Sequence, residues 1–214
     1  GDSLTTGSNN VAIGYAALAT EDAHGRNVAV GYKALETQDA GADAYNIAIG
    51  YNAGQAVTTG AQNVLMGGSA GDALTTGERN VAIGHGALGT EDTGSRNTAF
   101  GWSALTTLNY DGNGYNTAMG YSAGTSMSTG TYNTLIGGLA GDALTAGAGN
   151  VAVGYFALST EDAHGTNTAV GYRSLATLDA GADAYNVAVG YNAGFAMTTG
   201  VRSVLVGGSA GDAI

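Results

Sequence analysis

Asn10-Val11-Ala12-Ile13-Gly14-Tyr15 is the stretch that decides the fold, because close variants of it return along the whole chain. The asparagine position recurs twelve times, at intervals of 17, 19, 17 and 17 residues, after which the pattern restarts with a period of 70 residues. A short fixed period is typical of a solenoid, whose coils bury their apolar faces only by stacking on one another. The sequence therefore predicts an all-β fold, a parallel β-solenoid (β-roll) of about twelve coils of 17–19 residues.

The coils group into three 70-residue blocks of four, at residues 1–70, 71–140 and 141–210. We expect these blocks to form a single repeat domain over residues 1–214. The chain starts at Gly1 in the middle of a repeat and stops at Ile214 shortly after a new block has begun. We interpret it as a segment of a longer fibre protein.

Composition narrows the function. The chain has 38 glycines, no proline and no cysteine, so it can turn often, every residue keeps the N–H that a ladder needs, and disulfides and cysteine metal sites are excluded. Acidic residues outnumber basic ones 17 to 6, for a net charge of −11, which opposes binding to nucleic acid or to an anionic membrane. No apolar stretch approaches the ~18 residues of a membrane span, so we expect no membrane insertion.

Each repeat contains a short strand with two different faces. Val11 and Ile13 are β-formers at period two, whereas Ala12 and Gly14 between them are small. The small face lets another backbone approach closely. Either face is compatible with the interior of the roll: the bulky residues can fill the core while the small face packs on another layer or a second copy, or the reverse.

The asparagine column has a structural interpretation. Side-chain amides stacked in register about 4.8 Å apart can bond to one another along the column, as in cross-β stacks. The twelfth position is Ser203. The asparagines predicted to form this structural ladder are Asn10, Asn27, Asn46, Asn63, Asn80, Asn97, Asn116, Asn133, Asn150, Asn167 and Asn186.

The four coils of a block predict two corner shapes. Eight residues after the asparagine, the first two coils carry leucine, as at Leu18 and Leu35, and the next two carry glycine. In the glycine coils an apolar residue follows three places later, in a series that runs from Val57 and Leu74 to Ile214.

The strings Asn-Val-Ala-Ile-Gly-Tyr-x-Ala-Leu and Asn-Thr-Ala-Val-Gly-Tyr resemble the repeats in head domains of trimeric autotransporter adhesins and in bacteriophage tail fibres. The resemblance covers the whole chain, although the coils here are longer. It implies a left-handed parallel β-roll that associates as a homotrimer and attaches a cell or particle to a surface. It carries over no catalytic residues.

The longer loops contain oxygen ligands at alternate positions beside glycines, a pattern similar to the start of calcium-binding loops. The candidate calcium ligands are Asp39, Asp43, Asn109, Asp111, Asn113, Asp179 and Asp183. The alternative is a set of solvated acidic turns. The pair Glu21 and Asp22 repeats once per block, and adjacent carboxylates on a corner do not predict acid–base catalysis. His24 and His164 occupy matching loops, but a single imidazole does not predict a metal site.

An aromatic column follows the glycine of most repeats and is a possible ligand or interface strip. Exposed, it would suit stacking on sugars; buried, it would seal the roll or a subunit contact, which is the interpretation that a regular ladder favours. Its members are Tyr15, Tyr32, Tyr51, His85, Trp102, Tyr121, Tyr155, Tyr172 and Tyr191.

These observations predict a structural and adhesive segment of an extracellular, cell-surface or virion fibre, a homotrimer that contacts a host-surface glycan or protein. The alternative is a glycan-binding solenoid module that uses the aromatic column or the acidic loops, with calcium as a cofactor. A third candidate is ice binding, which would need threonine at the same place on nearly every coil. The chain shows no nucleophile–base pair, phosphate loop or clustered metal ligands in sequence, so we do not expect an enzyme.

Overall fold

A computed structural model, which describes residues 1–211, confirms an all-β parallel solenoid of about twelve turns. Ile214 lies outside the described residues. Residues 1–211 contain twelve three-residue strands. They are β1 (Val11–Ile13), β2 (Val28–Val30), β3 (Ile47–Ile49), β4 (Val64–Met66), β5 (Val81–Ile83), β6 (Thr98–Phe100), β7 (Thr117–Met119), β8 (Thr134–Ile136), β9 (Val151–Val153), β10 (Thr168–Val170), β11 (Val187–Val189) and β12 (Val204–Val206). No helix within residues 1–211 is long and apolar enough to cross a membrane.

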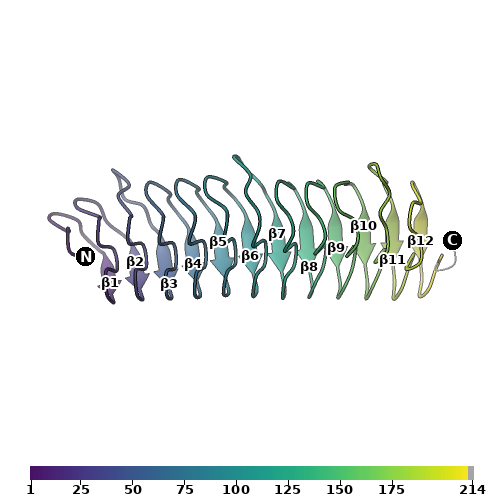
Figure 1. The fold of residues 1–214 in the computed structure, drawn as a ribbon, viewed down its shortest axis with the longest axis horizontal. Helices are drawn as coiled ribbons and strands as arrows, with labels where there is room; N and C mark the ends of the chain where they lie inside the picture. Colours follow the sequence, from purple (N-terminus) through teal and green to yellow (C-terminus); the bar gives the residue numbers. More distant parts are fainter. Residues whose placement is uncertain (212–214) are drawn as a thin grey trace. The chain divides into compact units, whose positions relative to one another are not determined.

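The chain divides into two compact units, and the division does not follow the 70-residue blocks. The first comprises Gly1–Ser103 with Asn109–Gly114, and the second comprises Ala104–Leu108 with Tyr115–Ile214. In the first, strands β1 to β6 lie side by side in sequence order (Figure 1). In the second, β7 to β12 do the same. Within each unit the register is strict: Val11 pairs with Val28, and Thr168 with Val187, so equivalent repeat positions lie opposite one another.

The small face of each strand forms the interior. The central residue of the strand is fully buried at Ala29, Ala48 and Leu65, while its two neighbours point outward. The outward residues are the bulky ones, so the core is filled from the Ala/Leu face. Of the two arrangements that the sequence left open, the structure adopts this one.

Both predicted corner shapes bury their apolar residue, and a strand residue accounts for the difference between them. Leu18 and Leu35 are buried at one corner type, and Val57 and Leu74 at the other. A Cβ added to Gly54 would lie 2.6 Å from the Cδ1 of Leu65, and one added to Gly71 would lie 2.8 Å from its Cδ2. The side chain of Leu65 therefore fills the interior volume that corner leucines such as Leu18 and Leu35 fill in the other coils.

The second unit repeats this arrangement. A Cβ on Gly124 or Gly141 would lie 2.7 or 2.8 Å from the side chain of Leu135. Alanine therefore stands at the strand centre of most coils, and leucine stands there once per block, beside two glycine corners.

The glycine that ends each strand packs against the next coil rather than against another layer. Gly67 has a φ of 133°, a conformation that favours glycine, and a Cβ there would lie 2.6 Å from the carbonyl oxygen of Gly84. Gly14, Gly31, Gly50 and Gly84 have the same relation to the following glycine. This column fixes the closest approach between consecutive coils.

Candidate functional site

The asparagine column joins each coil to the next through backbone groups. The Oδ1 of Asn63 accepts the backbone N–H of Asn80 at 2.9 Å, and its Nδ2 donates to the carbonyl of Gly77 at 2.9 Å. Asn46, Asn80 and Asn133 make the same two bonds. These bonds to the backbone differ from the expected amide-to-amide ladder, although the Nδ2 of Asn133 also donates to the Oδ1 of Asn116 at 3.3 Å. The side chain clamps the following coil at two points. Buried side chains with both amide ends satisfied have a structural role.

The clamp is weaker where a 19-residue step follows. Asn27 accepts the N–H of Asn46 at 3.0 Å, but its buried Nδ2 has no hydrogen-bond partner within residues 1–211. Asn167 accepts from Asn186 at 3.2 Å, and its Nδ2 turns back to Gly165 at 3.3 Å. The longer loop displaces the carbonyl that the amide otherwise meets.

The outward strand residues create an apolar sheet face on each unit. In the first unit the side chains of Ile47 and Phe100 are 37% and 48% exposed, and their neighbours along the sheet are half-buried. In the second unit Met119, Ile136 and Val189 are similarly exposed. Exposed apolar surface of this kind is typical of interaction sites in proteins. Sequence reasoning found these residues but could not decide on which side they lie.

The aromatic column is exposed along the same edge of the strands. Tyr15 is 71% exposed, and its ring stacks on Tyr32 at 5.4 Å between centroids, which stacks on Tyr51 at 5.2 Å. In the second unit Tyr155, Tyr172 and Tyr191 stack at 5.8 and 5.3 Å. His85, Trp102 and Tyr121 are also exposed. The rings do not seal the interior of the roll, so the column is available to a ligand or to another chain.

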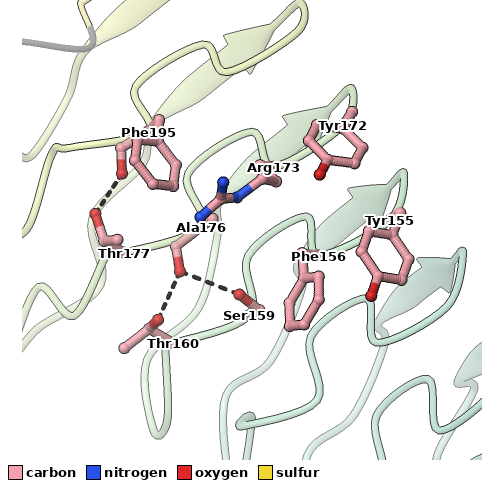
Figure 2. A pocket seen from close by; sticks show the side chains of 9 residues that line it. All are labelled: Tyr155, Phe156, Ser159, Thr160, Tyr172, Arg173, Ala176, Thr177 and Phe195. Carbon is pink, nitrogen blue, oxygen red and sulfur yellow. Dashed lines mark hydrogen bonds between the residues drawn. The ribbon is translucent and has the colours of Figure 1, made fainter.

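A groove of about 420 Å³ lies beside this column in the second unit (Figure 2). Its lining includes the rings of Tyr155, Phe156, Tyr172 and Phe195, and the guanidinium of Arg173 lies 4.2 Å from the Phe195 ring centroid. On the opposite side, the hydroxyls of Ser159, Thr160 and Thr177 donate to backbone carbonyls of the following coil. Phe156 and Phe195 belong to the third block, and the first block has Ala16 and Gln55 at the equivalent positions, so the repeats are not equivalent here.

Several of the candidate calcium ligands have partners within the protein. One oxygen of Asp43 accepts the N–H of Gly25 at 3.1 Å, and the other pairs with Arg26 at 2.9 Å. Asp183 likewise accepts from Gly165 at 2.9 Å.

In the middle block Asp111 accepts from the Thr93 hydroxyl at 2.7 Å, and Asn113 accepts from Arg96. Asn109 is exposed. Asp39 and Asp179 lie apart from Asp43 and Asp183, beside the Glu–Asp corners of the preceding coil.

Those corners hold buried glutamates, whose burial the sequence analysis did not predict. Glu21, Glu91 and Glu161 are fully buried. The Oε1 of Glu91 accepts the N–H of Gly94 at 2.8 Å, and its Oε2 accepts that of Tyr110 at 3.4 Å. Burial outweighs these bonds and raises the pKa of Glu91 to about 7. The sequence of the repeating Glu–Asp pair does not indicate that the glutamate is buried, because the corner is covered only when the coils stack on one another.

Comparison of the chain with protein-family models, with curated proteins and with solved structures gives no match.

Proposed function

We propose that this chain is a structural and adhesive segment of an extracellular or virion fibre, of the adhesin-head or tail-fibre type, which assembles as a homotrimer and contributes to surface or host attachment. The observation that carries the proposal is the exposed apolar sheet face of each unit, together with the exposed aromatic column beside it. A regular, exposed sheet face suits packing against the identical faces of further copies, since equivalent positions repeat along it.

Two further observations favour a load-bearing role over catalysis. Strand pairing in strict register and the asparagine clamps make each coil a rigid continuation of the one before. Where a 17-residue step follows, the buried amides of the column are used in bonds between coils rather than held free for chemistry, as at Asn63 and Asn80.

Solution mass tests the assembly. We expect the parent chain to scatter light with the mass of three chains, and the double variant Ile47→Lys/Ile136→Lys to scatter as one chain. Both isoleucines are 37% exposed on the apolar face, so the change places one charge per unit on that face without touching the interior. The control is Thr59→Lys/Thr129→Lys, which adds the same charges at exposed turns 70 residues apart and should remain trimeric. A monomeric parent chain contradicts the proposed assembly.

The groove of the third block favours glycan binding as a second candidate. Aromatic rings suit the apolar faces of sugars, and Arg173 offers a fixed cation for an anionic sugar. Arg173→Ala should weaken binding to an acidic oligosaccharide at least tenfold in calorimetry, whereas Lys33→Ala, at the same repeat position in the first block, should not. Equal binding by both variants contradicts this assignment.

Ice binding has less support. The threonine hydroxyls that repeat along the turns donate to backbone carbonyls of the next coil, as Thr5 does to Asp22 at 2.9 Å and Thr75 to Asp92 at 2.9 Å. Their protons are therefore committed within the solenoid.

A further inference from the structure

Stacking brings four metal-ligating side chains together at one corner of the first block. Glu21, Asp22 and His24 come from one coil, and Asp39 comes from the next. Each offers one ligand atom, and these atoms all lie within 4.8 Å of one another. Ligands on opposite sides of an ion with bonds of about 2.0–2.3 Å are about 4–4.6 Å apart, so the cluster has the dimensions of a coordination sphere. Glu161, Asp162, His164 and Asp179 repeat it in the third block.

The first cluster contains buried ligand atoms without partners. Glu21 is fully buried; its Oε1 accepts the backbone N–H of His24 at 3.0 Å, and its Oε2 has no hydrogen-bond partner in residues 1–211. The Nδ1 of His24 is also buried without a hydrogen-bond partner there, 3.5 Å from the Glu21 Oε1. A buried carboxylate oxygen left unpaired costs free energy, and a cation at the cluster would satisfy it.

The middle block shows how the corner is built when the histidine is missing. Gly94 replaces the histidine and Asn109 replaces the aspartate, so the two changes occur together. There both oxygens of Glu91 accept backbone N–H groups, from Gly94 and from Tyr110. A Cβ on Gly94 would lie 2.5 Å from the Glu91 Cδ and 2.5 Å from the Tyr110 carbonyl oxygen, so no side chain fits at this position. The corner without the imidazole therefore satisfies its carboxylate internally.

The third block gathers the same four residue types, with closer contacts inside the cluster. The Nδ1 of His164 lies 3.2 Å from the Glu161 Oε1, and the Glu161 Oε2 accepts the N–H of Ala180 at 3.4 Å, as the Glu91 Oε2 does that of Tyr110. Asp162 and Asp179 are exposed, as are Asp22 and Asp39. Each cluster thus has a buried anchor and an open side through which an ion can enter and water can complete the coordination.

We propose that these two clusters each bind one divalent first-row transition-metal ion, of which Zn²⁺ is the test case. One imidazole among carboxylates favours such an ion over Ca²⁺, which takes oxygen ligands. Because Asp39 and Asp179 belong to the coil after the one that carries the histidine, the ion ties consecutive coils together at their longest loops. The proposal rests on the fold and the clusters and is independent of the proposed function.

Calorimetric titration of the intact, chelator-treated chain with ZnCl₂ tests it. We expect two ions per chain and a higher melting temperature when they are bound, since an ion that binds only the folded state stabilises it. His24→Gln and His164→Gln should each bind one ion, and the double variant none. The control is His85→Gln, which alters the third histidine of the chain, on the aromatic column, and should keep two sites.

Three results would overturn the proposal: no zinc binding by the parent chain, a stoichiometry that the histidine changes do not alter, or three equivalent ions per chain, which would indicate nonspecific binding to all acidic loops. The first of these would leave the cluster as a contact between His24 and Glu21 without a bound ion. Asp39→Asn provides a second test at an exposed residue, where a loss of fold is not expected: it should bind one ion with a parent-like circular dichroism spectrum.

Discussion

At the scale of single residues, the asparagine amide performs two tasks with one side chain. Its oxygen accepts the N–H of the next asparagine, and its nitrogen donates to a carbonyl three residues before that asparagine, as Asn63 does with Asn80 and Gly77. Substitution leaves two buried backbone groups unpaired, and each such group costs about 1–3 kcal/mol.

Asn63→Ala should therefore lower stability by about 2–5 kcal/mol, because it orphans the Asn80 N–H and the Gly77 carbonyl. Asn27→Ala is the matched control: it removes the bond to the Asn46 N–H, but also an Nδ2 that has no partner within residues 1–211. Thermal melting should show a clearly smaller loss for Asn27→Ala. Equal losses would mean that the amide nitrogen contributes little.

Glu91 predicts a pH dependence. Its folded pKa of about 7 lies above the ordinary 4.5, so the folded chain holds a proton that the unfolded chain has already released between these values. Stability is therefore fully present below about pH 4.5 and falls as the pH rises to about 7, by on the order of 3 kcal/mol. Glu91→Gln should remove this decline. The free energy of unfolding of the variant, measured by urea titration, should therefore rise relative to that of the parent chain between about pH 4.5 and about pH 7. A constant difference between the two chains would contradict the assignment.

At the scale of the element, the coil-to-coil contact depends on the glycine that ends each strand. Gly67 is in a positive-φ conformation and faces the carbonyl of Gly84, whereas the adjacent Gly68 faces only the edge of His85, 3.3 Å from where its Cβ would be. Gly67 is thus required by its backbone conformation and by a backbone contact, whereas at Gly68 only a neighbouring side chain lies near.

Gly67→Ala should destabilise the chain by at least about 2 kcal/mol, because its Cβ would lie 2.6 Å from backbone and the φ is unfavourable. Gly68→Ala should cost under about 1 kcal/mol, since only a movable side chain lies near. Melting temperatures of the two variants provide the comparison. Similar losses would show that the column tolerates a wider spacing.

The strand and its period could be predicted from the sequence, because the regular spacing of the asparagines marks where each repeat and its strand begin. The sequence could not decide which face is inside, since Val11 and Ile13 are apolar and Ala12 fits equally well against a core or a neighbour. The deciding signal is present at Leu65, where leucine replaces the small residue beside two glycine corners. The histidine–carboxylate cluster was missed for another reason: Asp39 is 15 residues from His24, and only stacking places it there.

At the scale of the whole molecule, charge opposes compactness. The net charge of −11 is distributed over loops that repeat along each unit, and few cations offset it: Arg26 pairs with Asp43, Lys33 with Glu36 and Arg79 with Glu78. Exposed pairs of this kind contribute little.

Raising NaCl from about 10 to about 150 mM shortens the Debye length from about 30 to about 8 Å, so repulsion between loops should weaken. We expect the melting temperature to rise over this range in metal-free buffer. A fall would mean that the ion pairs outweigh the repulsion. Sodium sulfate at matched ionic strength is not an equivalent control, because sulfate also strengthens apolar burial.

The asparagine oxygens point one way along the chain: the Oδ1 of each accepts the N–H at the asparagine position of the coil that follows, as Asn10 does from Asn27 and Asn63 from Asn80. A finished coil therefore presents its hydrogen-bond acceptors to residues that are synthesised later, and we expect the coils to form in chain order. The 70-residue repeat also allows the length of the chain to change by duplication of blocks. Duplication of a 70-residue segment adds four coils whose joints repeat contacts already present, whereas an insertion that is not a whole number of coils would break the match between equivalent positions of neighbouring coils. A gene of this kind can lengthen or shorten its product in whole blocks.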